Sequence, residues 1–72
     1  MADREYMEKK YRLTDYMEKK VIGQVLTFVH NNDRFPTCRE INLNEQIECN
    51  YLHICYHFEG MENLKEKVKK HL

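Results

Sequence analysis

The chain has 72 residues, and its twelve lysines and arginines are balanced by twelve aspartates and glutamates. This length allows one small domain, and a net charge of zero is not typical of a strongly basic nucleic-acid-binding protein. No apolar run is long enough for a membrane span or a signal peptide, and the three cysteines lack the spacing of a disulfide framework, so we expect a cytoplasmic domain with reduced thiols.

The first predicted helix spans residues 3–12. It is supported by acid-before-base pairs at i,i+4 spacing, such as Glu5 with Lys9, which contribute about 0.2–0.5 kcal/mol each. Its narrow apolar edge does not continue at helical spacing into the next segment. We therefore predict that residues 1–13 form a helical extension, which is also a possible contact in a homodimer.

The second predicted helix is the longest. Thr14 is the expected N-terminal cap, and the first turn contains acidic residues, which the helix dipole favours there. The helix is expected to end near Asn31 and Asn32, because asparagine tolerates a left-handed C-terminal position. Its apolar stripe is the strongest periodic signal in the chain and consists of Met17, Val21, Ile22, Val25, Leu26 and Val29.

A short third helix is predicted from the sequence Thr37-Cys-Arg-Glu40. This spacing is typical of a capping box, in which the threonine and glutamate side chains bond to each other's backbone N–H groups. Pro36 stands just before the helix, and we expect Phe35 and Ile41 to be buried.

A fourth helix is predicted to begin at Asn50, after a polar loop of residues 44–48. Its apolar face follows i, i+3, i+4, i+7 spacing and consists of Tyr51, Ile54, Cys55 and Phe58. The opposite face, which we expect to be exposed, consists of Asn50, His53, Tyr56 and His57. Gly60 is expected to break the helix. A final stripe consists of Met61, Leu64, Val68 and Leu72, and no segment alternates like a strand.

Two motifs carry a resemblance to a known family. The first, Pro-Thr-x-Arg-Glu followed by an aliphatic residue and asparagine, is matched by Pro36, Thr37, Arg39, Glu40 and Asn42. The second, Phe-Gly-Ser-Trp before a last helix, is expected where Phe58, Gly60, Met61 and Leu64 stand, with Glu59 in place of the usual glycine and Met61 in place of the usual tryptophan. Over residues 17–70 the chain resembles the homing-endonuclease-associated repeat, a small trihelical DNA-binding module of phage and bacterial proteins. It departs from the family at residues 55–57, where Cys-Tyr-His replaces basic residues.

The resemblance implies an all-α, trihelical, helix-turn-helix-like domain over residues 14–72. It also implies a duplex-DNA-binding function, as in a small phage or bacterial transcriptional regulator. Asparagine can pair with adenine, arginine and lysine can contact phosphate, and tyrosine and histidine can contact either phosphates or bases. The predicted DNA-binding residues are Arg39, Asn50, His53, Tyr56, His57 and Lys65. The two histidines are expected to gain charge near pH 6.5 and to tighten binding in acid.

Other functions are weighed against this prediction. The polar face is equally compatible with a solvated helix surface, and zero net charge favours a protein-interaction module on the same fold, such as a small inhibitor or adaptor. Cys49, His53 and His57, with Cys38 nearby, have metal-ligand chemistry, but their spacing along a helix spans about 12 Å, too far for one zinc ion. No nucleophile is placed beside a base. We predict no metal, no cofactor and no enzymatic activity.

Overall fold

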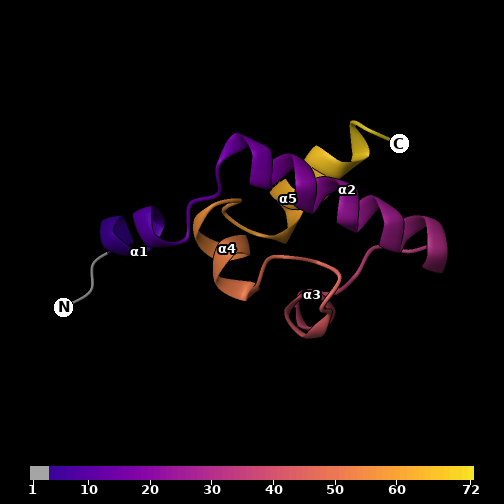
Figure 1. Cartoon of the computed structure of the whole chain (residues 1–72), viewed down its shortest axis with the longest axis horizontal. Helices are drawn as coiled ribbons and strands as arrows, with labels where there is room; N and C mark the ends of the chain where they lie inside the picture. Colours follow the sequence, from indigo (N-terminus) through magenta and orange to yellow (C-terminus); the bar gives the residue numbers. More distant parts are fainter. Residues whose placement is uncertain (1–3) are drawn as a thin grey trace.

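The computed structural model describes residues 4–72 (Figure 1). No strand occurs among these residues, so the all-α prediction is confirmed for the described part of the chain. Residue 3, where the first helix was predicted to begin, lies outside it. The division into residues 1–13 and 14–72 remains a prediction. The helices are α1 (Arg4–Lys10), α2 (Asp15–Asn32), α3 (Cys38–Leu43), α4 (Tyr51–Tyr56) and α5 (Met61–Lys69).

The ends of α2 follow from local chemistry. The Thr14 hydroxyl oxygen accepts a hydrogen bond from the Met17 N–H at 3.2 Å, which confirms the predicted cap. At the other end, the left-handed residue is Asp33, with φ of 57°, rather than one of the two asparagines before it. Its N–H donates to the Val29 carbonyl at 2.8 Å, which satisfies one of the carbonyls left free at a helix end.

The predicted capping box of α3 is also confirmed. The Glu40 N–H donates to the Thr37 hydroxyl oxygen at 3.1 Å, and the Glu40 carboxylate accepts from the Thr37 N–H at 3.1 Å. Arg34 then forms a forked pair with the same carboxylate, with both N–O distances at 2.7 Å. These donors favour the charged carboxylate, and they lower the pKa of Glu40 from 4.5 to about 2.

Glu40→Gln should change how acid affects stability. The folded-state pKa lies below that of the unfolded chain, so the stabilisation is complete above pH 4.5 and is lost as the pH falls towards 2. We expect the variant to be less stable at pH 6 and to lose less stability than wild type between pH 6 and pH 3. Urea unfolding followed by circular dichroism measures this. Glu45→Gln, which removes an exposed carboxylate, is the control. Equal pH dependence in wild type and Glu40→Gln would contradict the expectation.

The core lies where α2 packs on α5, and α4 packs on both α5 and α3 (Figure 1). These contacts bring together apolar stripes that are separated in the sequence and exclude water from them. The buried apolar side chains are Val21, Ile22, Val25, Ile41, Ile47, Cys49, Ile54, Phe58, Leu64 and Val68.

Phe35, which was expected to be buried, is only half-buried, and three further residues differ more clearly from the predicted burial. Tyr51 was expected on the apolar face of α4 but is 53% exposed, and Leu72 is 65% exposed. Ile47, in the loop predicted to be polar, is buried instead. For Tyr51, the reason is that α4 ends at Tyr56, so the helical spacing used for the prediction does not extend from Tyr51 to Phe58. Leu72 likewise lies beyond the last residue of α5.

Candidate functional site

Residues 11–13, which we call the segment before α2, cover the face of α4 that was predicted to be exposed. The Tyr11 ring stacks on Tyr56, with centroids 6.1 Å apart, and meets the edge of His53 at 5.5 Å. The Leu13 N–H donates to His57 Nδ1 at 3.0 Å. The expectation that His53, Tyr56 and His57 form a free surface row is therefore wrong, because residues just before α2 occupy it.

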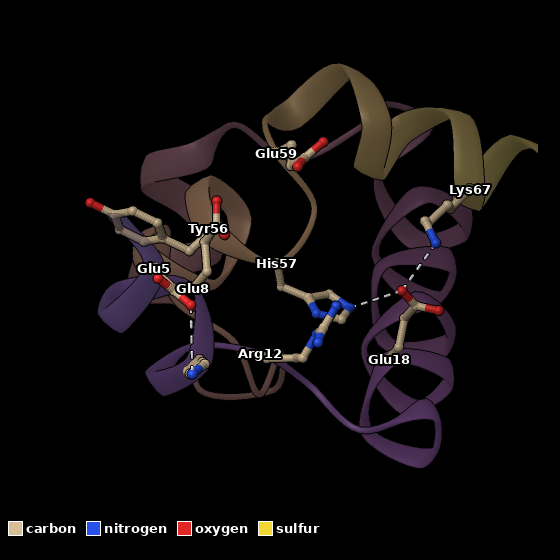
Figure 2. A pocket seen from close by; sticks show the side chains of 9 residues that line it. Glu5, Glu8, Arg12, Glu18, Tyr56, His57, Glu59 and Lys67 are labelled. Atoms are coloured by element: carbon tan, nitrogen blue, oxygen red, sulfur yellow. Dashed lines mark hydrogen bonds and ion pairs between the residues drawn. The ribbon is translucent and has the colours of Figure 1, made fainter. Parts of the chain in front are cut away.

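Both ring nitrogens of His57 are engaged inside the protein. Nδ1 accepts from Leu13, so the proton of the neutral ring lies on Nε2, which is 2.9 Å from Glu18 Oε1. Lys67 Nζ donates to the same oxygen at 3.1 Å. Figure 2 shows His57 and Lys67 both reaching towards Glu18. This His57 cluster joins the segment before α2 to α2, α5 and the end of α4, and it leaves no imidazole lone pair for a substrate.

Glu18 is the charged centre of the His57 cluster. Partial burial raises the pKa of this carboxyl, but hydrogen bonds from His57 and Lys67 outweigh that effect and hold the pKa below its usual 4.5. Its side chain is only 23% exposed. The carboxylate is therefore ionised at neutral pH and shielded on the side that faces the two donors.

A cleft of about 340 Å³ opens beside His57 (Figure 2). Its lining is mixed in charge, with cations from Lys9, Arg12 and Lys67. Four carboxylates lie in the same lining and would repel a DNA phosphate. The carboxylates belong to Glu5, Glu8, Glu18 and Glu59.

His53 also differs from its predicted role. Its Nδ1 accepts from the Asn50 N–H at 3.1 Å and completes a capping box at the start of α4. Burial lowers the pKa of His53 below the usual 6.5, and charge on His57 lowers it further. We therefore expect His53 to gain its charge at a lower pH than an unperturbed histidine.

A second surface is formed by α3 and the start of α4. It is a shallow hollow of about 570 Å³ with no carboxylate in its lining, and we call it the α3–α4 surface. Arg39 is exposed there and makes no ion pair among residues 4–72. The full lining is Cys38, Arg39, Asn42, Asn50, Tyr51 and Leu52.

The two asparagines of the α3–α4 surface have their oxygens occupied. Asn42 Oδ1 accepts from the Tyr51 N–H at 3.3 Å. Asn50 Oδ1 accepts from the N–H groups of Leu52 and His53 at 2.9 and 3.2 Å. Asn50 is therefore left with its NH₂ group, which can only donate, whereas Asn42 keeps one lone pair of its oxygen as well as its NH₂ group. The Asn42 bond also ties the end of α3 to the start of α4.

Only part of the predicted set comes together on this surface. Arg39 and Asn50 line it, whereas His53, Tyr56 and His57 face the segment before α2. Lys65 is half-buried on α5, with its Nζ 4.0 Å from Glu62, and it does not line the surface.

Asn42 and Tyr51 belong to the surface but were not predicted as site residues. Asn42 is the last residue of the first family motif, which was the available signal for it. Tyr51 was missed because helical spacing assigned it to the core. Its exposed position became evident only from the packing of α4.

The candidate metal ligands Cys49, His53 and His57 are buried or hydrogen-bonded within the protein. Burial, with a smaller contribution from charge on Cys38, raises the pKa of Cys49 to about 11, so this thiol is protonated at neutral pH and a poor ligand. His53 uses Nδ1 within α4, and His57 uses both nitrogens. Within residues 4–72, no three histidine, cysteine or acidic side chains are grouped to hold a metal ion.

Comparison of this chain with protein-family models, curated proteins and solved structures gave no match. No helix in the described residues is both long and apolar enough to cross a membrane. Functional inference for this chain therefore starts from its own side chains.

Proposed function

We propose that the α3–α4 surface binds duplex DNA and that α3 and α4 act as a helix-turn-helix-like unit of a small phage or bacterial regulator. One observation carries this proposal: the surface offers hydrogen-bond donors with no carboxylate among them. The donors are the Arg39 guanidinium and the NH₂ groups of Asn42 and Asn50, and the Tyr51 hydroxyl beside them interacts with Cys55. Phosphate oxygens and the guanine edge in the major groove are acceptors.

Each residue has a role that its geometry allows. Arg39 presents a planar fork of donors, which matches a phosphate or the O6 and N7 atoms of guanine. Asn50 and Tyr51 lie at the start of α4, the part of a recognition helix that contacts base edges. The predicted pairing of Asn50 with adenine through both its side-chain groups needs a free side-chain oxygen as well as the NH₂ group. That oxygen caps α4, so Asn50 contributes a donor alone.

The position of α4 supports this assignment. Ile54 is buried and fixes the rotation of the helix, and Phe58 is buried just after its end. The Asn42–Tyr51 hydrogen bond fixes the start of α4 against α3. The donors are thus held by packed elements, which lowers the conformational entropy lost on binding. All three cysteines are unpaired, which fits a reducing compartment, so we place this function in the cytoplasm of a bacterial or phage-infected cell.

Arg39→Gln should weaken binding of a labelled duplex at low salt by at least about fivefold, the lower end of the range for a specific arginine contact. Arg12→Gln is the matched control, because it removes the same charge from an exposed arginine in the cleft beside His57. We expect the control to bind like the wild type when fluorescence anisotropy is measured. Equal weakening in both variants would show that only the net charge of the protein matters, which would contradict a specific role for Arg39. An absence of binding by the wild type would refute the proposal.

A protein partner is the second candidate, and exposed apolar side chains on the same two helices favour it. Leu43 is 68% exposed and Tyr51 is 53% exposed, and aromatic and aliphatic groups of this kind are typical of interface centres. Leu43→Ser should leave duplex affinity unchanged if DNA is the ligand. Failure of the wild type to bind duplex, with self-association that Leu43→Ser abolishes in light scattering, would favour this candidate.

A further inference from the structure

A basic hollow of about 280 Å³ lies between α2 and α5, and we call it the α2–α5 hollow. Its lining contains three lysines and one glutamate, so its formal charge is +3 − 1 = +2 with histidine neutral. The single carboxylate, Glu18, is already bonded to His57 and Lys67. The lining residues are Glu18, Lys19, Ile22, Lys67, Lys70 and His71.

Two cations of the α2–α5 hollow are free. Lys19 and Lys70 are exposed and make no ion pair within residues 4–72. A lysine at the end of α5 is explained by the helix dipole, but Lys19 lies in the second turn of α2, where the dipole of its own helix does not favour a cation. The convergence of these side chains from two helices is therefore not a by-product of helix capping.

The α2–α5 hollow and the α3–α4 surface lie on different sides of the molecule. In Figure 1 the C-terminal end of α5 is at the upper edge and α3 at the lower edge, along the direction in which the molecule measures 22 Å. A straight duplex lying along α3 and the start of α4 would not also pass the C-terminal end of α5. DNA bound in the hollow would therefore be a different duplex segment from DNA bound at the α3–α4 surface.

We infer that the α2–α5 hollow binds phosphate groups of a second DNA duplex, so that one molecule bridges two duplex segments. This inference rests on the proposed DNA binding by the α3–α4 surface. Charge complementarity identifies the ligand: the hollow has a net positive charge and two unpaired lysines, and duplex DNA presents a dense row of phosphates. The hollow offers phosphate contacts and no groups for reading bases, so binding there rests on electrostatic attraction and is easily displaced by salt.

A bead assay tests the bridging. One short duplex is fixed to beads, a fluorescent duplex of the same sequence is added, and the fluorescence retained by the protein is measured at low salt. Lys19→Gln/Lys70→Gln should reduce retention at least about fivefold and lower the salt slope of retention by about two. Its affinity for a single labelled duplex should stay within about twofold of wild type, because the α3–α4 surface with its base-reading groups is intact.

The control is Lys9→Gln/Lys69→Gln, which removes the same charge from exposed lysines that do not line the hollow. It should bridge like the wild type, whereas Arg39→Gln should fail to bridge. Single-duplex binding without bridging by the wild type would overturn the inference and leave the proposed function standing.

Other results separate the two proposals. Bridging that survives in Lys19→Gln/Lys70→Gln would overturn the inference and indicate two copies of the chain joined to each other. If duplex binding needs Lys19 and Lys70 but not Arg39, the α3–α4 surface is not the DNA site. The bridging inference, which needs both surfaces, is then refuted as well.

Discussion

Val25→Asp should abolish the cooperative fold. Val25 is 1% exposed in the middle of α2, inside the core that also contains buried residues of α3, α4 and α5. A carboxylate there would have no ion-pair partner and would cost several kcal/mol, against a stability of roughly 5 kcal/mol for a domain of this size. We expect far-UV circular dichroism to show a loss of helix and no cooperative thermal transition.

Thr27→Asp is the matched control for Val25→Asp. It introduces the same side chain on the exposed face of the same helix, two residues away. This control should keep the helical spectrum and a cooperative melt. A cooperative melt for Val25→Asp at the wild-type temperature would contradict the burial of Val25 in the core.

His57→Ala should produce the second largest loss of stability. It removes the acceptor of the Leu13 N–H and one of the two donors to Glu18. A partly buried backbone N–H left without an acceptor costs about 1–3 kcal/mol in the free energy of unfolding. We expect a decrease in this range in urea unfolding, with no change in the amount of helix far below the transition.

Two further variants test the cause. His57→Asn places an oxygen near the position of Nδ1, so it should accept from Leu13 and recover part of the loss. His30→Ala removes an exposed histidine and should have little effect. If His57→Asn is as unstable as His57→Ala, the stabilisation comes from ring packing rather than from the hydrogen bond to the segment before α2.

The stability of the His57 cluster also bears on the DNA proposal. Loss of the Leu13 contact would release the segment before α2 from α4 and expose Tyr56 and His53. The α3–α4 surface would be unchanged, because Asn42 and Asn50 hold it through their own bonds. We therefore expect His57→Ala to bind duplex with wild-type affinity at temperatures where it is folded.

Local chemistry made several features predictable from the sequence. The caps at Thr14, Thr37 and Asn50 bond to N–H groups two or three residues along the chain, so the pattern of residue types was sufficient to predict them. The buried stripes of α2 and α5 were predictable for a related reason. These helices are long enough for a 3.6-residue period to show which side of each one is apolar.

The candidate site was less predictable, because its geometry depends on contacts between distant residues. Arg39 and Asn50 line one surface, whereas His53 and Tyr56, which helical spacing assigned to solvent, are covered by Tyr11. Contacts between aromatic rings are favourable, and the Tyr11 ring packs against both His53 and Tyr56. A period of 3.6 residues shows which side chains share a helix face, but it does not show what covers that face.

The sequence by itself determined that the described chain is helical and where α2, α3 and α4 begin, because capping bonds close within a few residues. Only the tertiary structure decided the role of His57, whose two nitrogens meet Leu13 and Glu18, 44 and 39 residues earlier in the chain. It also decided that Tyr51 is exposed and Ile47 is buried. The physical reason is that burial is a property of the assembled helices: each apolar residue competes for a core that exists only after α2, α4 and α5 have packed together.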